Sequence, residues 1–324
     1  MNYDGYDVIV VGGGIAGLTA SAYTSRSGLR TLLIEKNEEV GGLVSTIEKD
    51  GFYFDAGVRA LVDAGIIRPM LKDLNINLDF VKSPVSIGVE DKILNIENKE
   101  SLKDYKNLLC NLFPESKDDI ERIIQAVEKT MGYMDILYGI ENPAFKDIKK
   151  DRDFLFHTLL PWLPKFIFTI GKINKMNEPV EKYLSNITNN QSLKDMISQH
   201  FFKNTPAFFA LSYFSLYLDY IYPVKGIGQL TLSIRDKVLE FGGEIKTNTR
   251  IVKVFPGKKV IVDENGIEYE YNSLIWAADL KALYKTTELE GLPSKIVEEF
   301  EKKKKKILSS RGNDSVFTLF IEVD

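Results

Sequence analysis

The stretch Tyr6-Asp-Val-Ile-Val-Val-Gly-Gly-Gly-Ile-Ala-Gly17 decides the fold, because a short apolar run leads directly into a glycine-rich turn. Tyr6–Val11 has the continuous apolar character of a strand that is covered on both faces of a parallel sheet. The small and apolar residues from Ile15 to Ser27 favour a helix that packs closely on this sheet, and Gly28 suits its end. A second apolar strand at residues 32–34 completes a predicted right-handed βαβ unit.

The glycines of this turn have the spacing G-x-G-x-x-G, which is typical of dinucleotide-binding proteins. Gly12 permits a sharp turn, Gly14 lets a pyrophosphate approach the backbone, and Gly17 lets helix and strand approach each other. The free N–H groups at the start of the helix attract phosphate. Glu35 ends the second strand 18 residues after Gly17, where a carboxylate can accept hydrogen bonds from ribose hydroxyls. Glu35 would repel the 2'-phosphate of NADP, so these residues alone leave FAD and NAD open.

Composition excludes several other classes of protein. The 324 residues include 42 Lys and Arg against 46 Asp and Glu, a net charge of -4, which argues against a nucleic-acid partner. The single cysteine, Cys110, and the two histidines, His157 and His200, form no disulfide framework or zinc motif, and we predict no bound metal. About two domains are expected at this length.

Two later segments are apolar enough to test for membrane insertion. Prolines and Lys165 interrupt residues 159–170, and Asp219 interrupts residues 205–224, so neither segment is expected to span a bilayer. Either segment can lie against a membrane surface. The acidic N-terminal residues do not resemble a signal peptide. We therefore predict a cytoplasmic protein with peripheral contact at the inner face of the membrane.

Three further segments carry a resemblance to a known family. They are Glu35–Ser45 (EKNEEVGGLVS), Gly51–Gly57 (GFYFDAG) and Tyr222–Leu230 (YPVKGIGQL). Together with the glycine turn, they resemble the phytoene desaturase and carotenoid isomerase-like flavoproteins, within the wider class that includes monoamine oxidases. The resemblance extends over nearly the whole chain.

The resemblance implies FAD as the cofactor. Residues up to 17 would hold its pyrophosphate, Glu35 the adenosine ribose, residues 41–45 the diphosphate and ribityl chain, residues 55–59 the isoalloxazine, and Ile251 the adenine. The implied cofactor-binding residues are Gly12, Gly13, Gly14, Ala16, Gly17, Glu35, Lys36, Gly41, Gly42, Ser45, Asp55, Ala56, Gly57, Arg59 and Ile251.

The resemblance also implies an α/β architecture of the glutathione reductase and amine oxidase type. A discontinuous Rossmann-like FAD domain is expected at residues 1–84 and 225–280. A helix-rich α+β substrate domain is expected at residues 85–224 and 281–324. Members of this class end with a Gly-Asp segment that closes on the flavin, and no Gly-Asp dipeptide occurs here. We therefore expect a C-terminal portion beyond residue 324, with a last strand at residues 315–323 that exposes a sheet edge.

The implied reaction is hydride transfer to flavin from a long apolar substrate, a polyene or isoprenoid, with desaturation or isomerisation of C=C bonds. Two alternatives stay open, which are an amine oxidase-like flavoenzyme and a lipid-binding carrier on the same scaffold without redox activity. An NAD dehydrogenase has no second fingerprint to support it. The sequence leaves the oligomeric state open.

Nine aromatic residues gather between Phe201 and Tyr222, and four of them share one helical face. These residues are either ordinary core packing or an apolar wall along a polyene tunnel. No acid–base or nucleophile set stands out, which suits a flavoenzyme because the cofactor accepts the hydride. Arg59 and Asp219 are the charged residues that we would test first.

Overall fold

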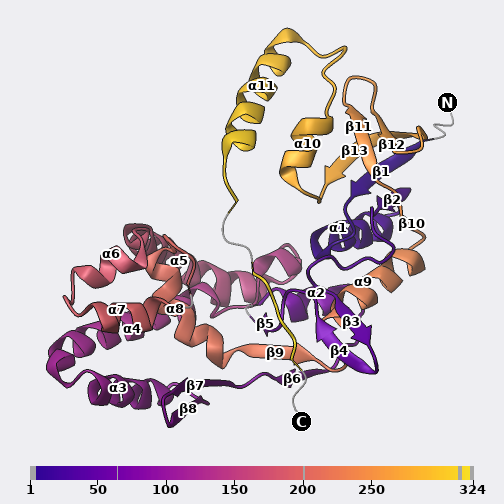
Figure 1. The fold of residues 1–324 in the computed structure, drawn as a ribbon. Coiled ribbons are helices and arrows are strands. Elements are labelled where there is room, and N and C mark those ends of the chain that lie inside the picture. The colour runs from indigo at the N-terminus through magenta and orange to yellow at the C-terminus, as the bar shows by residue number, and fades with distance from the viewer. Residues whose placement is uncertain (1–4, 64, 200, 313–315, 322–324) are drawn as a thin grey trace. The chain divides into compact units, whose positions relative to one another are not determined.

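The computed structural model describes residues 5–63, 65–199, 201–312 and 316–321, which divide into two compact units (Figure 1). The first unit contains the residues up to 60, together with 71–81 and 222–312. The second unit contains residues 61–70 and 82–221 and, of the described C-terminal residues, 316–321. The architecture is α/β, as predicted.

The first unit is built on a six-stranded sheet with the order β10-β2-β1-β13-β12-β11. The strands are β1 (Tyr6–Val11), β2 (Thr31–Ile34), β10 (Glu244–Lys246), β11 (Ile251–Phe255), β12 (Val260–Asp263) and β13 (Glu268–Trp276). Strand β1 lies between β2 and β13 and is parallel to both. Strands β10 and β11 are separated by residues 247–250, and β13 is one continuous strand of nine residues.

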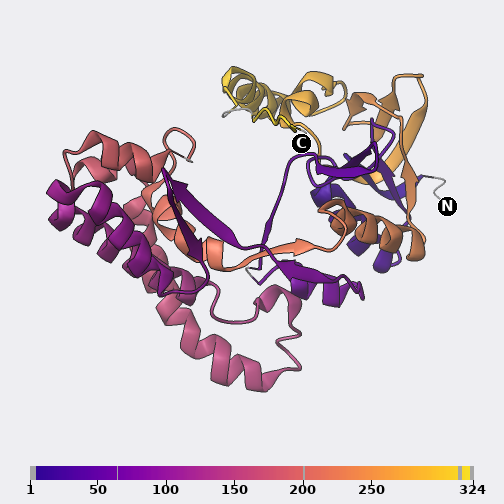
Figure 2. The ribbon, with the colours of Figure 1, turned by 60° about the horizontal axis from the view of Figure 1, so that its bottom comes forward.

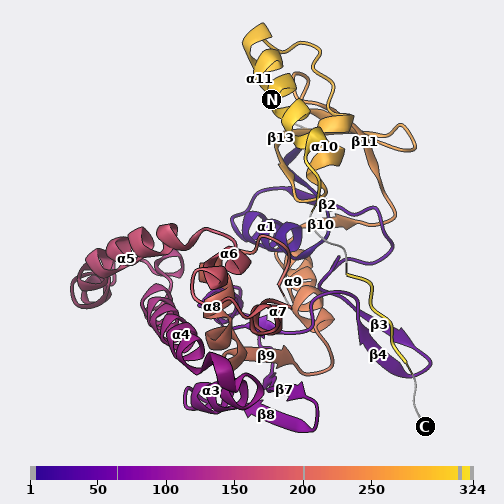
Figure 3. The same ribbon diagram turned by 60° about the vertical axis from the view of Figure 1, so that its left-hand side comes forward.

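Two helices pack against each other in this unit, α1 (Ile15–Arg26) and α9 (Gly228–Glu240) (Figure 3). The small residues of α1 permit close packing, since Gly17 and Ala22 are buried. The predicted βαβ unit is therefore present. The first unit also contains a hairpin of β3 (Thr46–Lys49) and β4 (Phe52–Asp55).

Helices α10 (Leu280–Thr286) and α11 (Ser294–Ser309) belong to the first unit, whereas the sequence placed residues 281–324 in the substrate domain. Helix α10 packs against β11, and Thr287 forms a bridge with Val254. These contacts attach α10 to the sheet. The sequence placed residues 61–70 in the FAD domain, whereas they belong to the second unit. Their strand β5 (Leu61–Val62) pairs with β9 (Tyr220–Pro223).

The second unit is mainly helical, as expected, and its helices pack side by side (Figure 2). Its α-helices include α3 (Ser101–Leu112), α4 (Lys117–Leu137), α5 (Leu160–Ile173), α6 (Val180–Ser185), α7 (Gln191–Ser198) and α8 (Ala207–Leu218). A hairpin of β7 (Val85–Val89) and β8 (Lys92–Ile96) lies beside α3. The smaller elements of this unit are a π-helix at Phe154–Leu159 and 3-10 turns at Pro114–Ser116, Pro143–Phe145 and Asn174–Met176. Helix α2 (Ile67–Asp73) and strand β6 (Phe80–Lys82) each contain residues of both units. Fully buried aliphatic residues such as Ile120, Leu193 and Leu211 form the core of this unit.

The prediction that prolines and Lys165 interrupt the helix at residues 159–170 is wrong. Residues Phe154–Met176 form one helical segment, and by length and composition this segment could cross a membrane. A π-helical turn at Phe154–Leu159 leads into α5, which contains Pro161 in its first turn and Pro164 in its interior. In a π-helix each backbone N–H bonds to a carbonyl five residues earlier, so the regular α-helical bonds that proline interrupts are already replaced before α5 begins.

The predicted strand at 315–323 is also wrong for the residues that the structure describes. Residues 316–321 have no strand structure. Val316 and Phe317 are strongly exposed, and strand geometry requires a neighbouring backbone to pair with. Ser315, Glu322 and Val323 lie outside the described residues.

Candidate cofactor-binding site

The turn after β1 needs glycine at two positions for reasons of packing alone. Gly12 has a φ angle of +109°, and a Cβ added to it would lie 2.8 Å from the carbonyl oxygen of Ala277. A Cβ on Gly17 would overlap the carbonyl oxygen of Gly12. These two glycines let α1 start directly against the end of the central strand.

Gly14 differs from them, because the fold itself leaves room for a side chain there. A Cβ added to Gly14 would meet no atom within 4 Å beyond its chain neighbours. Gly14 is the N-cap of α1, whose start has no side-chain cap and no acidic residue in its first turn. Free N–H groups beside open space, with no carboxylate competing for them, suit the binding of a pyrophosphate.

Glu35 lies at the carboxyl end of β2, and its side chain is only 8% exposed. The N–H of Gly13 donates to its Oε2 at 2.6 Å, and the N–H of Asn37 donates to its Oε1 at 2.9 Å. Each carboxylate oxygen can accept a further hydrogen bond. The carboxylate is thus held beside the glycine turn, in a position suited to a ribose.

The glycine pair after Glu35 joins the same surface. The N–H of Gly41 donates to the carbonyl of Gly13 at 2.8 Å. Both Gly41 and Gly42 have positive φ angles, of 118° and 58°. The hydroxyl of Ser45 donates to the carbonyl of Gly42 at 2.8 Å, which closes the loop. The structure therefore brings residues 41–45 next to residues 12–14, as a shared diphosphate site requires.

Residues 55–59 follow β4 and run back along the same loop. The N–H of Ala56 donates to the carbonyl of Ser45, and that of Val58 to the carbonyl of Leu43, both at 2.9 Å. Gly57 lies close to Leu43, and the side chain of Arg59 is exposed. The predicted residues from 41 to 59 thus form one connected segment of the first unit.

Asp55 has structural partners that the sequence did not reveal. Its Oδ2 accepts the hydroxyl of Tyr222 at 2.7 Å, and its Oδ1 accepts the hydroxyl of Thr46 at 3.1 Å and the N–H of Ile227 at 3.2 Å. The N–H of Gly228 donates to Oγ1 of Thr46 at 2.9 Å. This cluster fastens the β3–β4 hairpin to the start of α9. Burial and the bond to Asp55 raise the pKa of Tyr222 to about 12, so its hydroxyl stays protonated.

The remaining predicted residues lie around Glu35 and the start of α1. The N–H of Thr249 donates to the carbonyl of Glu35 at 2.9 Å, and Ile251 begins β11 two residues later. Lys36 and Ala16 are exposed. Every residue that was predicted to bind the cofactor therefore belongs to the first unit, and the loops that carry most of them are connected by hydrogen bonds.

We expect Glu35→Ala to lower both stability and flavin affinity. The N–H groups of Gly13 and Asn37 would lose their acceptor, which costs about 2 kcal/mol in the free energy of unfolding. The loss of the ribose contact would weaken FAD binding roughly 10- to 100-fold. Urea unfolding and flavin titration measure the two effects, with the exposed Glu38→Ala as the control. An unchanged flavin affinity would mean that another group anchors the ribose.

The second unit contains the predicted aromatic face. Neighbouring ring centroids of Phe209, Tyr213, Tyr217 and Tyr220 are 5.6, 5.1 and 6.0 Å apart, each pair in an edge-to-face arrangement. The hydroxyl of Tyr220 donates to that of Tyr213 at 3.0 Å. Burial raises the pKa of Tyr217 to about 12, with Tyr213 adding to the shift. The hydroxyl of Tyr217 therefore stays protonated at physiological pH.

The histidines, the cysteine and Asp219, which the sequence singled out in this unit, form no catalytic set among the described residues. His157 is exposed and pairs with Asp153 at 2.9 Å, and Cys110 is half-buried beside the core. His200 lies outside the described residues. Burial raises the pKa of Asp219, and the carboxylates of Asp63 and Asp135 add to this shift.

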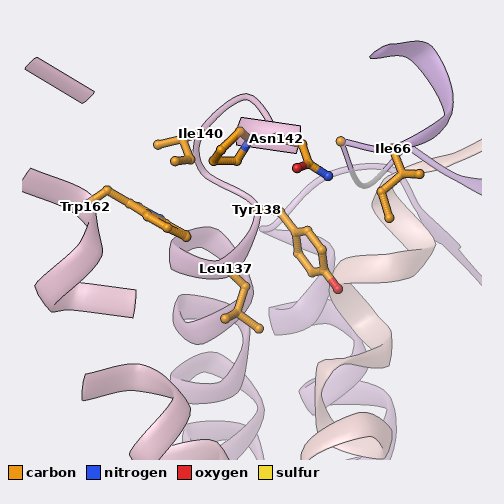
Figure 4. A pocket seen from close by; sticks show the side chains of 8 residues that line it. Ile66, Leu137, Tyr138, Ile140, Asn142 and Trp162 are labelled. Atoms are coloured by element: carbon orange, nitrogen blue, oxygen red, sulfur yellow. The ribbon is translucent and has the colours of Figure 1, made fainter. Parts of the chain in front are cut away.

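A small pocket lies beside the start of α5 (Figure 4). Its volume is about 160 Å³, below the ~300–1,000 Å³ of sites for drug-sized ligands. It could enclose only part of a long chain. Its lining includes Gly65, Ile66, Leu137, Tyr138, Ile140, Asn142, Pro143 and Trp162.

Known proteins share these features. The family of NAD(P)-binding Rossmann-like domains matches residues 10–74. Over 53 residues, or 16% of the chain, the sequence is 55% identical to a carotenoid 3,4-desaturase of Haloarcula japonica, of which it covers 11%. Over 286 residues, or 82% of the chain, it is 26% identical to an inactive all-trans-retinol 13,14-reductase of Danio rerio, of which it covers 44%. Other relatives are named prolycopene isomerase.

The chain resembles carotenoid desaturases and isomerases. This finding confirms the resemblance that the glycine turn and residues 35–57 indicated. Among solved structures, an oxidoreductase from Methanosarcina mazei superposes with a TM-score of 0.62 at 16% identity, over 92% of this chain and 64% of that chain. That likeness supports the Rossmann-type fold. The match covers less than half the length of each of the two curated relatives described above.

Proposed function

We propose that this chain belongs to an FAD-dependent oxidoreductase that acts on a long apolar substrate, a polyene or isoprenoid. The observation that carries the proposal is the open space at Gly14, beside the uncapped start of α1 and the buried carboxylate of Glu35. A dinucleotide fits these three features together. The names of the relatives favour carotenoid-type substrates and desaturation or isomerisation of C=C bonds.

The residues of the first unit would bind and orient the cofactor. Backbone N–H groups at the start of α1 would hold the pyrophosphate, and Glu35 would accept hydrogen bonds from the ribose and disfavour a 2'-phosphate. The loops at residues 41–45 and 55–59 would contact the rest of the cofactor. When bound, FAD supplies the hydride acceptor, so the protein needs no acid–base pair of its own for this step.

The residues of the second unit would orient the substrate. The rings from Phe209 to Tyr220 give an extended apolar aromatic surface, which suits a flat hydrocarbon. We also propose a cytoplasmic location. This location is consistent with the single cysteine, because structural disulfides are rare in a reducing compartment.

The proposal is tested by the visible absorption spectrum of the protein after incubation with FAD and removal of free flavin. Retained flavin is expected, followed by bleaching of the flavin bands on anaerobic addition of a polyene such as phytoene. Failure to retain FAD would contradict the cofactor assignment. Bleaching by primary amines with peroxide release in air, and none by polyenes, would favour the amine oxidase alternative.

A further inference from the structure

The helical segment Phe154–Met176 of the second unit has an apolar face that the rest of the described unit leaves uncovered. Ile167 and Phe168 are 62% and 66% exposed, and Leu160 and Leu163 are 46% and 40% exposed. Leu160, Leu163 and Ile167 follow one another at spacings of three and four, so they lie along one side of α5. Only 11% of the most apolar window of this segment is buried, so the segment is not an ordinary core helix.

The opposite side of the segment is attached to the unit along its length. Phe154, Thr169 and Ile173 are buried, and the indole N–H of Trp162 donates to the carbonyl of Ile136 at 2.6 Å. Ile136 belongs to α4, which lies on the inner side of α5 (Figure 3). A helix that is packed lengthwise on a soluble unit cannot be surrounded by lipid, but it can lie flat at a lipid surface.

The charge of this segment is opposite to that of the whole protein. Residues 154–177 contain Lys165, Lys172 and Lys175 and no Asp or Glu, although the chain has a net charge of -4. Lys172 lies 4.3 Å from the ring centroid of Phe168, beside the apolar face. Within the part of the chain that the structure describes, Lys165 and Lys175 have no ion pair. Their positive charges are available to an external anion.

We propose that this segment docks the protein on an anionic lipid bilayer, with α5 parallel to the surface. Phe168 and Ile167 would enter the region between headgroups and acyl chains, and the lysines would contact lipid phosphates. A second copy of the chain fits this face less well, because its lysines would add like charges to the contact. Lys165 in the middle of the segment also argues against a helix that crosses the bilayer. The inference does not depend on the proposed redox function.

Flotation of the purified chain with lipid vesicles tests the inference. We expect binding to vesicles of phosphatidylcholine that contain about 30% phosphatidylglycerol. Binding to pure phosphatidylcholine should be roughly 100-fold weaker, because the segment has three lysines that each contribute about five-fold. High salt or alkaline carbonate should release the protein. Absence of binding to anionic vesicles would overturn the inference, and so would retention after the carbonate wash, which indicates a spanning helix.

Two pairs of substitutions locate the binding surface. Ile167→Asp with Phe168→Asp should weaken vesicle binding about 100-fold, since two apolar side chains no longer enter the lipid. The control Ile93→Asp replaces a residue that is 77% exposed on the hairpin of the same unit, and it should bind as the wild type does. Equal losses in both proteins would overturn the assignment to α5.

The second pair, Lys165→Gln with Lys175→Gln, keeps the test valid if the apolar variant folds poorly. Each lysine should contribute roughly five-fold to binding, so the pair should lose about 25-fold on anionic vesicles and almost nothing on neutral ones. The control is Lys303→Gln with Lys305→Gln on α11 in the first unit. Sedimentation of each protein without lipid completes the test. A wild-type dimer that the apolar variant dissociates, with vesicle binding unchanged, would show that a second copy covers this face.

Discussion

Replacing Gly14 by valine is expected to abolish FAD uptake while the protein stays folded. The valine side chain would occupy the open space at the start of α1, where the structure has no protein atom within 4 Å of an added Cβ. A displaced pyrophosphate would lose at least two charge-assisted hydrogen bonds, which corresponds to a loss of affinity of about 100-fold or more. Gly14 has an extended backbone, with φ −72° and ψ 178°, which valine adopts readily.

Flavin titration and urea unfolding of the Gly14→Val variant check both halves of this expectation. The free energy of unfolding should stay within about 1 kcal/mol of the wild type, since the change only replaces a glycine N-cap. Gly88→Val is the matched control, because Gly88 also has open space around it but lies on β7 in the second unit. It should leave flavin binding unchanged. A Gly14→Val protein with wild-type flavin affinity would refute the pyrophosphate assignment.

Gly17→Ala is expected to have the opposite signature, a large loss of stability that does not require the cofactor. The new methyl group would overlap the carbonyl oxygen of Gly12, so α1 must move away from the end of β1. Overpacking of this kind costs about 3 kcal/mol, here at the centre of the first unit.

Urea unfolding without flavin measures this loss, and Gly132→Ala is the control. Gly132 lies within α4, and a Cβ there would meet no atom within 4 Å. The control should become more stable by roughly 0.5–1 kcal/mol, because alanine favours the helix. If Gly17→Ala unfolds at the same urea concentration as the wild type, the close approach of α1 to the glycine turn is not a constraint.

The parts of the fold that sequence predicts well are those whose cause is local. The βαβ unit follows from an apolar run, a glycine turn and a helix within a few residues of one another, and the structure has each of these elements. Residues 41–57 could be assigned to the same surface because they resembled a known pattern. Their hydrogen bonds to residues 12–14 and to one another explain that pattern physically.

The parts that sequence missed depend on partners far away in the chain. Tyr222 reaches Asp55 across 167 positions, and no local signal indicates this pairing. Ser116 begins α4 without a side-chain cap, although the S-x-x-D pattern there is typical of one. It ends a preceding 3-10 turn, and Asn190 from a distant part of the chain donates to its hydroxyl. The sequence placed residues 281–312 in the substrate domain, whereas the structure groups them with the first unit, and no local signal reveals the contacts of α10 and Thr287 with β11.

The two N–H groups that hold Glu35 affect the affinity of the protein for its coenzyme. A glutamate side chain in water samples many rotamers, and restricting it costs roughly 1.5–2 kcal/mol. Here that restriction is already met when the chain folds, because Gly13 and Asn37 fix both carboxylate oxygens. An incoming nucleotide would therefore find its sugar anchor preorganised, and more of the energy of each new hydrogen bond would appear as affinity.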